Sequence, residues 1–153
     1  MDKLILKCEI PGRVRPLKNS KQLIYIKGRS FIIPSKEYKA WLVTAKEHLM
    51  FAKGRSSFAF PYEDRIHVKV LAFYDHHPCD LDNALSSIAE ALQAVCVVIN
   101  DNLIASYDGS RILKCGRGQS RVEIEVYTLV YCKHIRDEGK DQAYYIIKEQ
   151  IDG

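Results

Sequence analysis

Residues 80–103 read DLDNALSSIAEALQAVCVVINDNL, and this stretch decides how the rest of the chain is organised. Apolar residues recur in it every three or four positions, at Leu81, Leu85, Ile88, Leu92 and Val95. This spacing predicts a helix with one apolar face. A β-branched run and the turn residues Asn100 and Asp101 then break the pattern. We therefore expect a helix followed by a reversal of the chain.

Carboxylates stand at both ends of the expected helix. Asp80 and Asp82 lie at its start, and Asp101 lies just beyond its end. One interpretation is helix capping, because an aspartate at a helix start accepts hydrogen bonds from free backbone N–H groups. The other is a divalent-cation site, because Mg²⁺ prefers oxygen ligands. If the chain doubles back after the helix, Asp101 approaches Asp80 and the three carboxylates meet.

The motif Asp80-Leu81-Asp82-Asn83, followed by Asn100-Asp101, resembles that of the RusA-type Holliday junction resolvases of bacteria and phages. That family has Asp-x-Asp-Asn at a helix start and an aspartate-containing turn about twenty residues later. The resemblance covers most of the chain as far as residue 131, because further matching segments occur in the family's order, at 18–20, 28–29, 33–38 and 122–126. One position departs from the family: Ser86 stands where a lysine is usual.

The resemblance implies a Mg²⁺-dependent endodeoxyribonuclease that resolves four-way DNA junctions as a homodimer, with Mn²⁺ as the alternative metal and no organic cofactor. Asp80, Asp82 and Asp101 would be the metal ligands, and Asn83 would orient the motif or a metal-bound water. Because Ser86 brings no positive charge, a catalytically weak or inactive protein that binds branched DNA is an alternative. A nuclease for other branched or flapped DNA is a third.

Charge is strongly segregated along the chain, although the net charge is only +4. Residues 11–55 carry eleven Lys or Arg against two acids, residues 56–110 carry eight acids against two bases, and residues 111–121 carry four bases and no acid. Basic flanks around an acidic middle favour a polyanionic partner that is held by its phosphates. The residues expected to contact DNA are Arg15, Lys18, Asn19, Lys27, Arg29, Lys36, Arg111, Lys114 and Arg117.

The remaining pattern predicts an α+β single domain, in which a mixed sheet with hairpins packs against two main helices. Strands are expected at 4–10, 65–74, 103–107 and 121–127, and a hairpin around residues 27–30. A helix should start after the N-cap Ser35 and end near Gly54, with Trp41 in the core rather than stacked on a base. Residues 108–111 should form a turn, and 114–119 a basic hairpin tip. The endonuclease domain would cover residues 1–135, and residues 136–153 would form an acidic tail with a short helix near 144–147.

Composition excludes several other classes of protein. Five scattered cysteines without a Cys-x-x-Cys pair argue against a disulfide framework and against structural zinc, including at His76, His77 and Cys79. No run of about 18 apolar residues is present, and the first residues are too charged for a signal peptide. We therefore expect a cytoplasmic protein without membrane contact.

Overall fold

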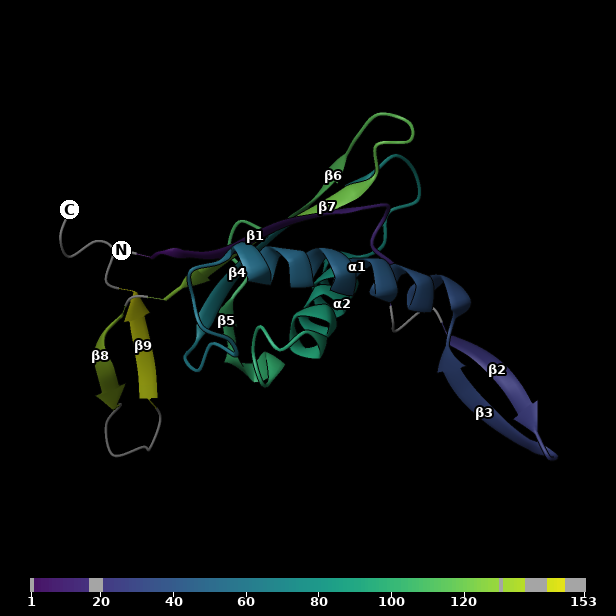
Figure 1. Cartoon of the computed structure of the whole chain (residues 1–153), viewed down its shortest axis with the longest axis horizontal. Coiled ribbons are helices and arrows are strands. Elements are labelled where there is room, and N and C mark those ends of the chain that lie inside the picture. Colours follow the sequence, from purple (N-terminus) through teal and green to yellow (C-terminus); the bar gives the residue numbers. More distant parts are fainter. Residues whose placement is uncertain (1, 17–20, 130, 137–142, 148–153) are drawn as a thin grey trace.

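A five-stranded mixed sheet forms the centre of the protein, whose computed structural model describes residues 2–16, 21–129, 131–136 and 143–147 (Figure 1). The strands are β1 (Leu4–Pro11), β4 (Ile66–Tyr74), β5 (Ile104–Ser106), β6 (Arg111–Lys114) and β7 (Arg121–Thr128). Their order is β1, β7, β4 and then β5, with β6 also on β4. β7 is antiparallel to β1 and β4, whereas β5 and β6 are parallel to β4. The chain is a single small α+β domain, as expected.

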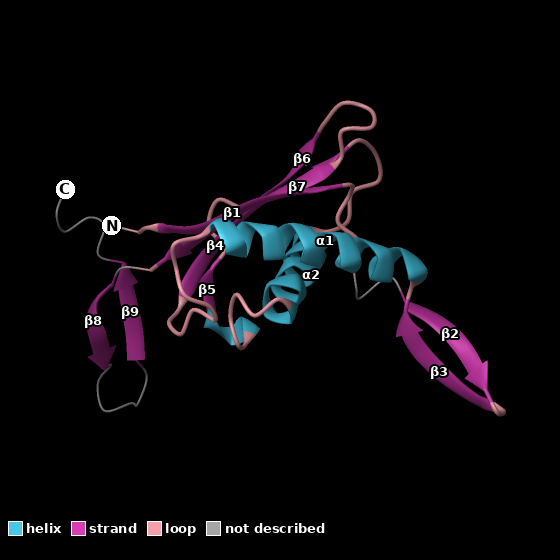
Figure 2. Cartoon of the chain, in the orientation of Figure 1, coloured by secondary structure: helices cyan, strands magenta, loops and turns pink. Residues whose placement is uncertain are grey.

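Two helices pack beside the sheet, α1 (Lys36–Arg55) and α2 (Leu81–Ala94) (Figure 2). α1 begins at the predicted N-cap, because the hydroxyl of Ser35 accepts a hydrogen bond from the N–H of Tyr38 at 3.2 Å. It ends one residue after Gly54, also as predicted. A short 3₁₀ helix, η1 (Asp101–Leu103), follows α2.

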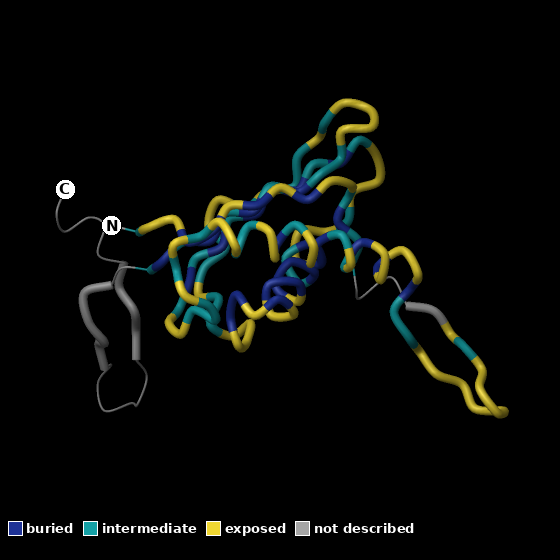
Figure 3. Tube along the Cα trace, viewed as in Figure 1, coloured by how far each residue is buried: buried dark blue, intermediate teal, exposed yellow. Residues whose placement is uncertain are grey.

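The hydrophobic core lies between the helices and one face of the sheet (Figure 3). Burial alternates along β4 and along β7, so that every second residue is buried and those between are half-buried. This alternation is expected for an antiparallel pair with one covered face. Trp41 is 6% exposed and packs 6.0 Å from the ring of Tyr38, so it belongs to the core, as expected.

The segment between β6 and β7 is a crossover loop, and the predicted hairpin tip at residues 114–119 is wrong. β6 pairs with one edge of β4 and β7 with the other, so β4 separates the two strands. The loop passes over the carboxyl end of β4, where the N–H of Cys115 donates to the carbonyl of Tyr74 at 3.1 Å. Strand patterns alone do not show whether consecutive strands are neighbours, because a third strand can pair between them.

Two hairpins form sheets of their own. β2 (Lys21–Ile26) and β3 (Arg29–Pro34) pair around the predicted turn, and β8 (Tyr131–Arg136) pairs with β9 (Ala143–Ile147). The predicted C-terminal helix near 144–147 is therefore wrong. Tyr and Ile dominate β9, and both residue types favour a strand over a helix.

No helix in the described part of the chain is both long and apolar enough to cross a membrane.

Replacing Ile124 with alanine should lower the free energy of unfolding by about 2–5 kcal/mol, because this fully buried side chain of β7 would leave a cavity. The matched control is Ile32→Ala in β3, where the side chain is 70% exposed and the change should stay within about 0.5 kcal/mol. Urea unfolding of both variants measures the difference. Equal losses would contradict the placement of the core.

Candidate functional site

The carboxylate of Asp75 anchors the loop that leads from β4 into α2. It accepts hydrogen bonds from the N–H of Gly118 at 3.0 Å and from the hydroxyl of Ser120 at 2.9 Å, and it lies 2.6 Å from Nδ1 of His76. These donors, the Gly118 N–H first among them, hold the pKa of Asp75 well below its usual 3.8. Nε2 of His76 accepts from Arg13 at 3.3 Å, since arginine only donates. The crossover loop and the start of α2 are therefore connected.

Asp80 and Asp82 lie at the start of α2, where the sequence predicted them. Asp80 is the N-cap residue, and its carbonyl accepts the N–H of Ala84 at 3.0 Å, but its carboxylate makes no capping hydrogen bond. Asp82 is exposed in the first turn, whereas Asn83 beside it is buried. Capping thus accounts for the backbone of Asp80 and leaves its carboxylate exposed to solvent.

The chain reverses after α2, as expected, and brings Asp101 alongside the helix. Cys96 has a φ of 59°, in the left-handed region, and helps the backbone leave the helical path. The N–H of Asp101 donates to the side-chain oxygen of Gln93 at 3.1 Å, and Asn100 caps η1 by accepting from the N–H of Asn102. Because Gln93 lies in the last turn of α2, the Asp101 backbone is held near the C-terminal end of the helix.

A hollow of about 350 Å³ lies between α2 and the segment that follows it, and we call it the acidic hollow. Its polar lining residues are Asp82, Ser86, Glu90, Asp101 and Tyr107. Three of them are carboxylates, and no basic side chain lines it among the described residues. A concave surface lined by one sign of charge concentrates ions of the opposite sign, so this hollow attracts cations.

The three predicted metal ligands do not meet at one point. Asp82 and Asp101 share the acidic hollow, whereas Asp80 is not among its lining residues. Asp82 and Glu90 are two helical turns apart, which corresponds to about 12 Å along the axis. Accordingly, within the described ranges no three His, Cys, Asp or Glu side chains are grouped closely enough to hold one metal ion. The same is true of His76, His77 and Cys79.

Sequence reasoning missed two residues of the hollow, Glu90 and Tyr107. Glu90 follows Asp82 and Ser86 at intervals of four, so the helical period already placed the three on one face of α2. Tyr107 had no such signal, because the turn after β5 positions it. Burial, and then the charge of Asp101, raise the pKa of Tyr107, so its hydroxyl keeps its proton and remains a hydrogen-bond donor.

The donor set of the hollow fits magnesium better than zinc. Carboxylate and hydroxyl oxygens line it, and neither histidine nor cysteine does. Mg²⁺ is usually held by one or two carboxylates while it keeps several water ligands, and the hollow offers carboxylates as ligands. Ser86 stands at the lysine position of the resembled family, and its hydroxyl donates to the carbonyl of Asp82 at 2.9 Å. Because its hydroxyl is neutral, it adds no positive charge beside the carboxylates.

The described residues expected to contact DNA fall into two groups, apart from Arg15. The exposed residues Lys27, Arg29 and Lys36 lie on the β2–β3 hairpin and the first turn of α1, and the exposed residues Arg111, Lys114 and Arg117 lie on β6 and the crossover loop. In the view of Figure 1 the hairpin extends away from the N-terminal end of α1, whereas β6 and the crossover loop lie above α1. Arg15 is held near α2, because its carbonyl accepts a hydrogen bond from Ser87 at 2.7 Å. Lys18 and Asn19 lie outside the described residues.

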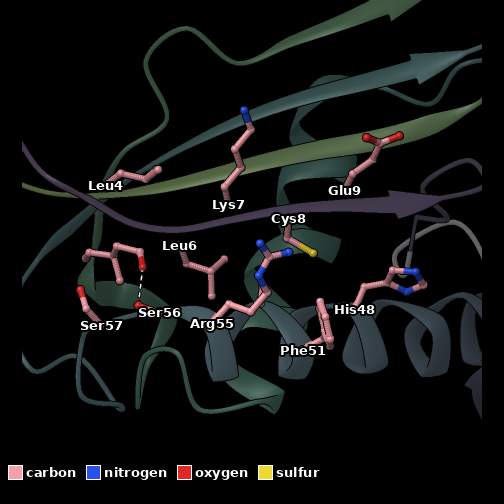
Figure 4. A pocket seen from close by; sticks show the side chains of 12 residues that line it. Leu4, Leu6, Lys7, Cys8, Glu9, His48, Phe51, Arg55, Ser56 and Ser57 are labelled. Carbon is pink, nitrogen blue, oxygen red and sulfur yellow. Dashed lines mark hydrogen bonds between the residues drawn. The ribbon is translucent and has the colours of Figure 1, made fainter.

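A second hollow, of about 530 Å³, lies between β1 and the C-terminal half of α1 (Figure 4). Lys7 and Glu9 of β1 and His48, Phe51 and Arg55 of α1 line it. The hydroxyl of Ser56 donates to the carbonyl of Ile5 at 2.6 Å at one end. It has a single carboxylate and none of the residues expected to bind metal or DNA, so it is a weaker candidate than the acidic hollow.

The sequence matches no protein-family model, and no curated protein matches it. What the chain does therefore has to follow from its own residues.

Replacing Asp75 with asparagine should lower the melting temperature at pH 7, because an amide cannot replace both acceptor oxygens of the carboxylate. Since the folded-state pKa of Asp75 is depressed, its contribution is complete above the unfolded value of 3.8 and is lost as pH falls through the folded value. The difference between wild type and Asp75→Asn should therefore shrink below about pH 4 in thermal unfolding. Asp108→Asn is the control, on an exposed turn. A difference that does not change with pH would refute this role of the charge.

Proposed function

We propose that this protein is a metal-dependent endonuclease of the RusA type that cleaves branched DNA, with the four-way junction as its substrate. The observation that carries the proposal is the acidic hollow, where Asp82 of α2 and Asp101 of η1 line one surface and no described lining residue is basic. The motif order along the sequence supports the same conclusion independently of the geometry.

The distribution of charge supports a nucleic-acid substrate that is bridged by a cation. Lys27, Arg29, Arg111, Lys114 and Arg117 are exposed on elements that project from the body, where they can reach phosphates. DNA repels carboxylates, so an acidic hollow on a protein with basic surfaces would weaken DNA binding unless a cation neutralised it. A hydrolytic site for phosphodiesters has this combination of charges.

Each residue of the hollow has a role in this proposal. Asp82 and Asp101 would hold Mg²⁺, and the bound ion would polarise the phosphoryl oxygen and lower the pKa of a water nucleophile. Glu90 can accept a hydrogen bond from a water in the hollow and orient it. Tyr107, which keeps its proton, can donate a hydrogen bond to a phosphate oxygen. Ser86 leaves the phosphate charge without the cation that the family lysine would supply.

A second function is favoured by two specific observations, the serine at position 86 and the separation of the carboxylates. On this alternative the chain is a branched-DNA-binding protein that cleaves weakly or not at all. The basic elements would serve both functions, so binding alone does not distinguish them, whereas cleavage does.

The proposed enzyme acts as a homodimer. A four-way junction presents equivalent strands related by a two-fold axis, and two copies related by the same symmetry would present two hollows to them. Paired nicks are the expected product.

Asp82→Asn and Asp101→Asn should each lower the rate of junction cleavage at least about 100-fold in Mg²⁺, because each removes a negative charge that holds the ion. Junction affinity should stay the same or rise, since a charge that repels DNA is lost. Cleavage of a labelled synthetic junction in Mg²⁺, Mn²⁺ and EDTA measures the rate, and gel shift in EDTA measures affinity. Asp108→Asn is the control. Wild-type rates in both variants, or cleavage in EDTA, would exclude the proposed site.

Ser86→Lys should raise the cleavage rate roughly tenfold or more, because a cation in the hollow would stabilise charge that develops on the phosphoryl group. Ser86→Met is the matched control, as its side chain is long but uncharged. An equal rate in wild type and Ser86→Lys would show that the chain does not need this cation. Cleavage rates on a junction, a flap and a duplex, measured in the same assay, identify the preferred substrate.

A further inference from the structure

The β2–β3 hairpin extends away from the rest of the chain (Figure 1), and most of its described residues are exposed (Figure 3). Its exposed large apolar residues are Leu23, Tyr25, Ile26, Phe31 and Ile32. Within the described chain, β2 and β3 pair only with each other, and no side chain described in residues 23–34 belongs to the core. A two-stranded hairpin alone is at best marginally stable in water. These side chains therefore belong against a partner.

Both faces of the hairpin are apolar. Leu23 lies opposite Ile32, and Ile24 lies opposite Phe31 in the next pair. Residues directly opposite each other share a face and successive pairs alternate, so these two pairs lie on different faces. A hairpin that only covered a protein surface would need a single apolar face. A hairpin with two apolar faces suits insertion between two surfaces.

The tip of the hairpin combines cations with aromatic rings. Lys27 and Gly28, with φ values of 52° and 76°, form the tight turn, and Arg29 follows. Tyr25, 72% exposed, lies two residues before this turn, and Phe31, 46% exposed, lies three residues after it. Residues 21–34 carry three basic residues and no acidic one. Basic and aromatic side chains together favour a nucleic acid, because cations bind phosphates and rings stack on bases.

We propose that the β2–β3 hairpin is a wedge that inserts at the branch point of DNA, where Tyr25 and Phe31 stack on bases while Lys27 and Arg29 hold the adjoining phosphates. This inference rests on the proposed function, since branched DNA is its ligand. It gives a role to the apolar faces of the hairpin, which the proposed function alone does not explain.

A branch point suits such a wedge better than a duplex does. Apolar side chains that enter a duplex must first unstack a base step, and this costs free energy. Base pairs at the branch point are stacked less firmly than base pairs inside a duplex. Inserting a side chain beside them therefore costs less free energy. The wedge thus provides preference for branched DNA without reading its sequence.

A second copy of the chain fits the hairpin less well. In a two-fold contact the same patch meets itself, which would bring the Lys27 and Arg29 pairs of two hairpins together. The hollow between β1 and α1 offers no better complement, because Lys7 and Arg55 line it with only one acid, Glu9. Charge complementarity therefore favours the polyanion.

The test uses the full chain in EDTA, so that binding is measured without cleavage. The probes are a four-way junction with 2-aminopurine at the branch point and a duplex of the same length with 2-aminopurine at its centre. We expect wild-type protein to raise the fluorescence of the junction, because the base becomes unstacked. In the double variant Tyr25→Ser/Phe31→Ser this rise should be lost and junction affinity should fall roughly tenfold or more, with duplex affinity changing less than about threefold.

Three controls accompany the double variant. Phe51→Ser removes an exposed aromatic ring from α1 and should leave both affinities unchanged. Tyr25→Phe keeps the ring and should retain the fluorescence rise. Lys27→Ala/Arg29→Ala should weaken junction and duplex binding alike, as expected for phosphate contacts. Melting temperatures confirm that each variant is folded.

Unchanged fluorescence and junction affinity in the double variant would overturn the wedge. So would a shift from dimer to monomer in sedimentation with junction binding intact, which would assign the hairpin to a second copy. A wild type that cleaves junctions without a fluorescence rise overturns the wedge and leaves the enzyme. A hairpin-dependent rise without cleavage in Mg²⁺ or Mn²⁺ overturns the enzyme and leaves the wedge.

Discussion

The position of β4, with strand partners along both of its edges, is the constraint on which the rest of the structure depends. β7 pairs along one edge of β4, while β5 and β6 pair in succession along the other. Between β5 and β6 the N–H of Val70 donates to the hydroxyl of Ser110 at 2.9 Å, which replaces a missing strand partner. Because both edges are occupied, the chain must pass over the end of β4 to reach β7. That passage brings Ser120 and Gly118 to Asp75, and Asp75 in turn fixes the loop before α2.

The acidic hollow depends on this arrangement at its other end. α2 contributes Asp82, Ser86 and Glu90 from one face, but the opposite wall comes from η1 and the turn after β5. β5 is held beside β4, and Gln93 holds η1 beside α2. The wall is therefore anchored to both the sheet and the helix. Its carboxylates line one shared space and no described residue of that lining is basic, so the hollow attracts cations.

The hairpin shows a different balance between local and tertiary forces. Six residue pairs and a tight turn specify its backbone, yet no side chain described in residues 23–34 belongs to the core. Burial of apolar surface supplies most of the free energy of folding, so a hairpin without burial contributes little to the stability of the domain. Its apolar residues are better explained by binding than by folding. The domain can in consequence tolerate changes there that its core cannot.

Much of the fold follows from the sequence alone, because local signals determined it. The capped helix α1, the hairpin turn at Gly28, the strands β1, β4 and β7, and the reversal after α2 all have short-range causes in propensity, period and turn chemistry. The sequence also identified Asp82 and Asp101 as residues of interest, and helical period alone would have added Glu90.

Only the tertiary structure decided which of these elements are neighbours. In the sequence, β6 and β7 look like a hairpin because they are separated only by a short, turn-rich segment. In the structure β4, which lies forty residues before β6, pairs between them. In the same way Tyr107 joins the hollow, Asp80 stays outside it, and the carboxylates remain too far apart to hold one ion as a trio. Pairing across long sequence separations depends on the packing of the whole domain, and no local pattern carries that information.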